Sequence, residues 1–180
     1  MAVLDILVAP DPRLKEVAKP VDNVDDAIRQ TLNDMLETMY KAQGVGLAAT
    51  QVGISKRLVV MDIANPNEGE KPAPMKFVNP VVTEESGEIV PFQEGCLSVP
   101  GSFEDVERPA TCTVEYLDEN GKPQTLKAEG FVATAIQHEI DHLDGILFVD
   151  HISALKRKMI VKKLEKLKKR GAIFHPDLHK

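Results

Sequence analysis

The chain has 180 residues, 43% of them hydrophobic, and a net charge of −6, which predicts a globular protein with one domain over residues 1–180. No apolar run approaches the roughly 20 residues that a transmembrane helix needs, and no leader-like segment opens the chain, so a cytoplasmic protein without membrane insertion is expected. Its two cysteines, Cys96 and Cys112, form no pattern that requires a disulfide.

The first half of the chain predicts one helix and two strands. Residues 11–14 favour a short turn, and apolar residues at helical spacing over residues 25–43 favour a helix that Gly44 is placed to end. Buried strands are expected within residues 57–63 and 77–82, with a polar loop between them. The helix is expected to pack one face inward.

The second half predicts a hairpin and two helices. Strand-like alternation over residues 111–117 and 124–128 flanks an Asp-Glu-Asn-Gly turn sequence, which is typical of a hairpin. Helices are expected over residues 131–143 and 153–170. Strands and helices do not alternate regularly, so we expect an α+β fold. In it, antiparallel or mixed sheets wrap around the helix at 131–143, and the last helix is C-terminal.

A helical His-Glu-x-x-His motif carries the clearest chemical signal. A helix turns about 100° per residue, so His138 and His142 return to nearly the same face and can hold one metal ion, with Glu139 beside it. Catalytic zinc-type sites commonly use three protein ligands and leave a fourth position open. The better candidate for the third ligand is Cys96, upstream, whereas His151 is the only nearby candidate downstream.

Three segments together resemble the peptide deformylase family. They are Gly-Val-Gly-Leu-Ala-Ala-Thr-Gln at residues 44–51, Glu-Gly-Cys-Leu-Ser at residues 94–98 and Gln-His-Glu-Ile-Asp-His at residues 137–142. The resemblance covers essentially the whole chain, including the basic C-terminal helix of the main bacterial type. It implies a metal-dependent hydrolase that removes the N-formyl group from formylmethionyl ends of newly made polypeptides and releases formate.

The same resemblance implies the role of each residue in the reaction. The metal ligands are Cys96, His138 and His142, and the general acid/base is Glu139. The donors that meet the charge on the carbonyl oxygen are the side chain of Gln51 and the backbone N–H of Leu97. An open metal site lowers the pKa of bound water toward about 7, which suits this hydrolysis.

Substrate-binding residues follow partly from helix geometry. Phe131, Thr134 and Ala135 share a helix face with His138, so they are expected to line the space beside the metal. The resemblance places the methionine side chain there. It adds five further contacts, the side chains of Phe92 and Glu94 and the backbone of Val45, Gly46 and Gly95. Some family members carry an arginine where Phe103 stands.

The ligand types do not select one metal. A thiolate with two imidazoles suits zinc, iron, cobalt or nickel. The resemblance implies one divalent metal per chain, Fe²⁺ in the cell, which Zn²⁺, Ni²⁺ or Co²⁺ can replace.

The C-terminal end differs in charge from the rest of the chain. Residues 1–150 carry 12 Lys and Arg against 26 Asp and Glu, whereas residues 151–180 carry 10 against 2. Within the helix at 153–170, an apolar stripe is expected to pack on the body: Leu155, Met159, Ile160, Leu164 and Leu167. The lysines predict an anionic partner, and the resemblance suggests ribosomal RNA near the nascent-chain exit.

A monomer is expected. His175 and His179 are interpreted as part of a frayed tail rather than a second metal site.

Two other functions remain open from the sequence. A zinc peptidase would use the same helix with a downstream third ligand, for which His151 is the candidate. A catalytically silent protein that binds nascent chains or the ribosome would need a broken ligand set. The segments at residues 44–51, 94–98 and 137–142 are intact, which favours the hydrolase.

Overall fold

The computed structural model describes residues 2–169 and the side chains as far as residue 166. Three α-helices, seven strands and four short 3₁₀ helices make up this part of the chain. In chain order they are η1 Pro12–Lys15, α1 Asp26–Lys41, β1 Gly46–Ala48, η2 Ala49–Val52, β2 Leu58–Met61, η3 Pro66–Glu68, β3 Met75–Glu85, β4 Ile89–Cys96, β5 Val99–Pro109, β6 Thr111–Leu117, β7 Pro123–Glu129, α2 Gly130–Leu143, η4 Phe148–His151 and α3 Ala154–Lys169.

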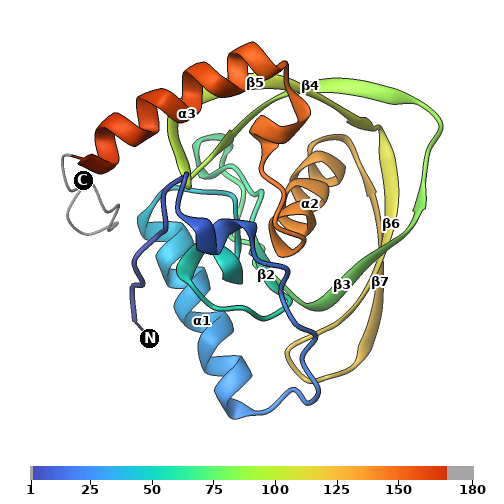
Figure 1. Cartoon of the computed structure of the whole chain (residues 1–180). Helices are drawn as coiled ribbons and strands as arrows, with labels where there is room; N and C mark the ends of the chain where they lie inside the picture. Colours follow the sequence, from blue (N-terminus) through green and yellow to red (C-terminus); the bar gives the residue numbers. More distant parts are fainter. Residues whose placement is uncertain (1, 170–180) are drawn as a thin grey trace.

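The strands form two antiparallel sheets. One has five strands in the order β1-β2-β3-β6-β7, and the other is the hairpin of β4 and β5. Figure 1 shows α2 near the centre of the molecule, with β3, β6 and β7 along one side of it and α1 beyond β2 on the other. The expected α+β fold around a central helix is therefore confirmed.

The central position of α2 follows from its sequence. Ten of its side chains are buried, so the helix has almost no face for solvent. Its apolar residues pack against the five-stranded sheet, where Ile136 and Leu143 meet Val59, Phe77 and Val114. Burial of such side chains stabilises the fold by roughly 1.5–3 kcal/mol each. The polar residues of the same helix are thereby held toward the β4–β5 hairpin.

The first predicted helix is confirmed, but its end is built differently. The side chain of Asp25 caps its first turn, and the backbone of Gln43, with φ of 59°, turns the chain at its end. Gly44 is not in the left-handed conformation. A glycine is favoured here because the side chain of Leu97 lies close to the backbone: a Cβ atom on residue 44 would lie 2.8 Å from Cδ1 of Leu97.

The β4–β5 hairpin was not expected as such. Its strands carry mostly exposed or half-buried residues, with Pro91 and Pro100 near its two ends, so the apolar alternation is weak. Pairing between the strands, from Ile89 opposite Pro109 to Cys96 opposite Val99, gives the hairpin its structure. Residues 101–105 belong to β5.

The C-terminal helix packs less completely than its apolar stripe predicts. Leu164 is buried and Ile160 packs beside it, but Leu155 and Met159 are 70% and 65% exposed. Figure 1 shows α3 along the outside of the molecule. The side chain of Leu167 and residues 170–180, with His175 and His179, lie outside the described part of the chain. Among residues 2–169, none of the helices has the length and apolar character that a bilayer crossing requires.

Candidate active site

Three possible metal ligands converge from two elements. Cys96 ends β4, and His138 and His142 lie one turn apart on α2. The Nε2 atom of His142 lies 3.2 Å from both the sulfur of Cys96 and Nε2 of His138, and all three ligand atoms lie within 4.8 Å of one another. Such a set fits a metal ion with tetrahedral coordination, which would have three protein ligands and one open position.

The two imidazoles differ in the surroundings of their Nδ1 atoms. Nδ1 of His138 lies 2.8 Å from Oε1 of Glu94, which leaves its Nε2 to face the other two ligand atoms. Burial would lower the pKa of His138, but contacts with Cys96 and Glu94 raise it to about 10. Nδ1 of the buried His142 has no partner within the described residues, and burial lowers the pKa of this imidazole. The neutral imidazole is the form that binds a metal.

A set of paired charges lies on the Nδ1 side of His138, away from the other two possible ligands. Arg108 donates from Nε and Nη2 to the two oxygens of Glu94, at 2.7 and 3.0 Å, and from Nη1 to Asp141 at 2.7 Å. Burial would raise the pKa of Glu94, yet hydrogen bonds from His138 and Arg108 hold it below its ordinary value. We call Glu94, Arg108 and Asp141 the ion-pair chain. Arg108 and Asp141 are functional candidates that the sequence did not indicate, because their pairing depends on how β5 crosses α2.

Glu139 lies beside the ligand set with one free oxygen. Its Oε1 is 3.9 Å from Nε2 of His138, and its Oε2 has no partner within the described residues. Burial is the main cause that raises the pKa of this carboxyl to about 7. A Cβ atom on Gly46 would lie 2.9 Å from Oε1 of Glu139, so the glycine leaves the carboxylate its space.

Gln51 and Leu97 lie next to Cys96. The Oε1 atom of Gln51 accepts the N–H of Ala48 at 2.9 Å, which directs the amide NH₂ toward Ser98 Oγ at 3.1 Å and the sulfur of Cys96 at 3.4 Å. Leu97 lies in the turn that joins β4 to β5. Both line the same cavity as Glu139.

A cavity of about 510 Å³ opens beside these groups. Seven of the eight residues expected to bind substrate line it, namely Val45, Gly46, Glu94, Gly95, Phe131, Thr134 and Ala135. Phe92 is not among the lining residues. Phe103 lines the cavity instead, and a Cβ atom on Gly95 would lie 2.5 Å from its ring. The carboxylate of Glu94 is already bound by Arg108 and His138.

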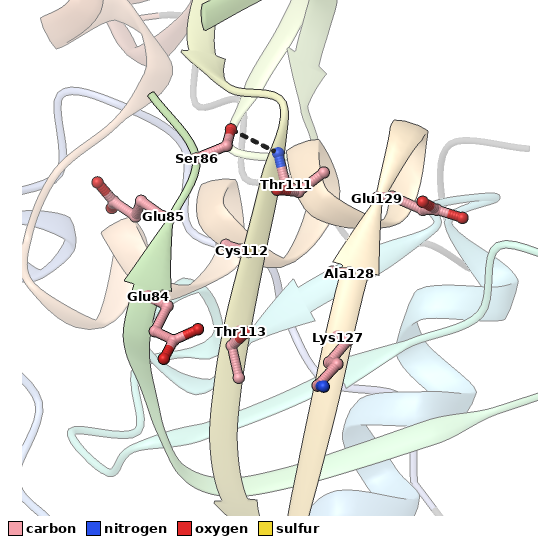
Figure 2. A pocket seen from close by; sticks show the side chains of 9 residues that line it. All are labelled: Glu84, Glu85, Ser86, Thr111, Cys112, Thr113, Lys127, Ala128 and Glu129. Atoms are coloured by element: carbon pink, nitrogen blue, oxygen red, sulfur yellow. Dashed lines mark hydrogen bonds between the residues drawn. The ribbon is translucent and has the colours of Figure 1, made fainter. Parts of the chain in front are cut away.

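Cys112 lies apart from this site. Figure 2 shows it on β6, between Glu84 and Glu85 of β3 and Lys127 and Glu129 of β7. These residues line a pocket of about 370 Å³. The thiol is buried, which raises its pKa to about 11. It therefore packs as a small apolar residue, as the sequence suggests.

His151 does not reach the ligand set. Its Nε2 lies 2.8 Å from Oδ2 of Asp141, and the group of possible ligands found among residues 2–169 contains Cys96, His138 and His142. Within the described residues, the candidate metal site therefore has an upstream cysteine rather than a downstream histidine as its third possible ligand.

Comparisons with known proteins agree with this geometry. A sequence model of the polypeptide deformylase family matches residues 3–158. The peptide deformylase of Alkalilimnicola ehrlichii is 57% identical over 96% of this chain and 95% of its own length. That of Stutzerimonas stutzeri is 54% identical over 96% of this chain and 100% of its own.

Solved structures give the same result. The peptide deformylase of Ehrlichia chaffeensis superposes with a TM-score of 0.89 at 41% identity and covers 94% of this chain and 99% of its own. The Thermotoga maritima enzyme superposes with a TM-score of 0.79 at 41% identity, over 85% and 99% of the two chains. The sequence match, the superposed fold and the three converging ligand atoms agree: the chain belongs to the polypeptide deformylase family.

Proposed function

We infer that this protein is a metal-dependent peptide deformylase, which hydrolyses the N-formyl group of formylmethionyl polypeptides and releases formate. The observation that carries the inference is the convergence of Cys96, His138 and His142 beside Glu139 in one cavity. The family match over residues 3–158 supports the same reaction. The peptidase alternative is not favoured, because its downstream ligand His151 is bonded to Asp141 instead.

We propose that Cys96, His138 and His142 hold one divalent metal ion, Fe²⁺ in the cell. The donor set also suits Zn²⁺, Ni²⁺ and Co²⁺. When bound, such an ion supplies Lewis acidity and makes water a nucleophile near neutral pH. The orphaned Nδ1 of His142 and the Glu94 contact of His138 both leave Nε2 available as ligand.

Glu139 is the proposed general acid/base. Its free Oε2 accepts a proton from the attacking water and then passes it to the amine that leaves the formyl carbon. A pKa of about 7 suits both transfers, because the group gains and loses a proton easily near neutral pH. The absence of a side chain at Gly46 leaves this carboxylate the space that it occupies.

Gln51 and Leu97 are proposed to meet the negative charge that develops on the formyl oxygen. The amide of Gln51 has its oxygen fixed by Ala48, so its NH₂ is presented to the site in one orientation. The backbone N–H of Leu97 is the second donor. Loss of one such donor typically costs about 10²-fold to 10³-fold in rate.

The rest of the cavity binds the peptide. We propose that Phe131, Thr134 and Ala135 surround the methionine side chain, since all three line the cavity from the same face of α2 as His138. The backbone of Gly46 and Gly95 pairs with the peptide from opposite sides. Phe103 offers an apolar rim.

We further propose a cytoplasmic monomer that docks on ribosomal RNA near the nascent-chain exit through α3. On this helix Lys158, Lys162 and Lys166 are exposed, together with the apolar Leu155 and Met159. Lysines that neutralise phosphates release counterions, which favours binding to RNA. Lys156 instead ties the helix to Glu104 of β5 at 3.2 Å.

The test of the deformylase reaction is formate release from formyl-Met-Ala-Ser by protein prepared without oxygen. Acetyl-Met-Ala-Ser and the unmodified peptide are the controls. Formate release from the formyl peptide, with neither control cleaved, is expected. Cleavage of an internal peptide bond without formate would favour the peptidase, and no reaction with fully metal-loaded protein would favour the silent binding protein.

A further inference from the structure

His151 lies at the outer end of a continuous set of polar contacts that ends at the metal site. It is the last residue of η4, and its side chain is 37% exposed. Its Nε2 is hydrogen-bonded to Oδ2 of Asp141 at 2.8 Å. The same oxygen accepts a hydrogen bond from Nη1 of Arg108 at 2.7 Å. Arg108 binds both oxygens of Glu94, which bonds Nδ1 of His138 at 2.8 Å.

Each contact in this series restricts the next one. Glu94 accepts the Nδ1–H of His138, which fixes the tautomer and directs Nε2 inward. Both oxygens of Glu94 are held by the planar guanidinium of Arg108, so the position of the carboxylate follows that of the arginine. The remaining arm of Arg108 is held by Asp141.

Asp141 is the most exposed member of the ion-pair chain, although it is still half-buried. Its side chain is 22% exposed, against 4% for Glu94 and 6% for Arg108. Burial would raise its pKa, but hydrogen bonds from His151 and Arg108 keep it below the ordinary value. Without a second donor, this carboxylate can rotate toward water and leave the buried arginine with one partner fewer, which is costly for a buried charge.

We propose that His151 is a positioning residue for the metal ligand His138, and that it acts through the ion-pair chain. By holding Asp141 in place, His151 fixes Arg108 and Glu94 and so keeps His138 in the orientation that retains the metal. The proposal rests on the ligand set proposed above but does not depend on the reaction that the metal serves. Its readouts are metal release and a proton resonance, so its failure is distinguishable from failure of the deformylase assignment.

The test compares His151→Phe, which keeps a ring but removes the donor, with His151→Gln, whose amide can still donate to Asp141. Zinc-loaded protein is mixed with excess chelator and zinc release is timed. Loss of a partner behind a metal ligand typically costs about 10-fold to 100-fold in affinity, so we expect His151→Phe to release zinc about tenfold faster. His151→Gln should restore most of the wild-type rate.

Asp150→Asn is the matched control. Asp150 lies in the same turn, where it bonds Lys15 and the N–H of Leu147 but not Asp141. It should release zinc at the wild-type rate. Wild-type zinc release in His151→Phe, or equal acceleration in Asp150→Asn, would overturn the proposal, because His151 would then act only as part of the turn.

Two further readouts separate positioning from local stability. In the zinc-loaded protein, the Nδ1–H proton resonance of His138 should move upfield in His151→Phe and return in His151→Gln, as its hydrogen bond to Glu94 weakens and recovers. In a Glu94→Gln background the chain is already broken, so His151→Phe should add little to zinc release. An unchanged resonance, or the same acceleration in that background, would contradict the proposal.

Discussion

The helices α2 and α3 have similar lengths and opposite environments. Ten of the 14 residues of α2 are buried, whereas Leu164 is the one buried side chain among the described residues of α3. In α2, burial shifts the pKa of Glu139 to about 7 and lowers that of His142. In α3, the lysines whose side chains are described are exposed. Titratable groups of the buried helix therefore have shifted pKa values, whereas those described in the exposed helix present their side chains at the surface.

This contrast predicts that changes in the two helices are separable. Variants at the buried polar face of α2 and its neighbours should alter catalysis or metal content with little effect on docking. Variants on the exposed face of α3 should do the reverse. The following predictions run from the largest expected effect to the smallest.

Glu139→Gln should lower kcat by about 10²-fold to 10⁴-fold, because the amide fills the same space but cannot accept the proton. Metal content should stay at the wild-type level, since Glu139 is not a proposed ligand. Metal analysis beside formate release would measure both. The control is Glu129→Gln, at the exposed start of α2, which should keep wild-type turnover. Near-normal turnover in metal-loaded Glu139→Gln would mean that another residue is the base.

Gln51→Glu should lower kcat by about 10²-fold, the lower end of the effect of losing one oxyanion donor. The variant keeps the oxygen that accepts from Ala48, so the local fold has its hydrogen bond, but it loses the NH₂ group. Gln51→Ala removes both and should be at least as slow. If steady-state kinetics showed only a higher KM at full kcat, Gln51 would bind substrate without stabilising the transition state.

The raised pKa of Glu139 predicts a pH-dependent stability of the metal-free protein. Its folded pKa of about 7 exceeds the ordinary value of 4.5, so the folded state holds the extra proton between these values and loses stability as pH rises through about 7. Glu139→Gln should therefore be more stable than wild type at pH 8 by at most roughly 3 kcal/mol, and the difference should shrink toward pH 4.5. Denaturant unfolding of both proteins measures the difference, and an equal gap at all pH values would contradict the prediction.

Glutamate at Lys158, Lys162, Lys163 and Lys166 should leave cleavage of a short formyl peptide nearly unchanged and weaken ribosome binding. The side chain of Lys169, another candidate, lies outside the described residues. Each lost phosphate contact should reduce the salt dependence by about one unit of slope. Cosedimentation with ribosomes across a salt series measures this binding. Lys127→Glu, on β7 of the five-stranded sheet, is the control. Equal binding by the multiple variant at every salt concentration would leave α3 as a packed, solvated end.

The sequence predicted local features better than long-range ones. His138, Glu139 and His142 lie on one helix, so their arrangement follows from helical spacing alone. The charges of Arg108 and Asp141 are unremarkable in the sequence, because their partners are brought together only when β5 packs beside α2. For the same reason the sequence did not separate the buried part of the α3 stripe from its exposed part.

Two further differences have local causes. Phe92 was expected in the cavity, but β4 contributes only its last residues, Gln93 to Cys96, to the lining. Gly44 was expected to cap a helix, and the contact with Leu97 that requires a glycine there could not be foreseen from spacing. Both depend on the β4–β5 hairpin, which the sequence signals only weakly.

A metal titration under anaerobic conditions tests the central claim most directly. Metal-free wild type, Cys96→Ser and Cys112→Ser receive increasing Fe²⁺ or Co²⁺, and formate release from formyl-Met-Ala-Ser is followed at each step. Wild type and Cys112→Ser should gain activity in proportion to metal and stop at one equivalent per chain, whereas Cys96→Ser should bind little metal and stay inactive, because a neutral hydroxyl replaces the thiolate. Full metal binding and activity in Cys96→Ser, or activity that does not depend on metal, would contradict the proposed centre.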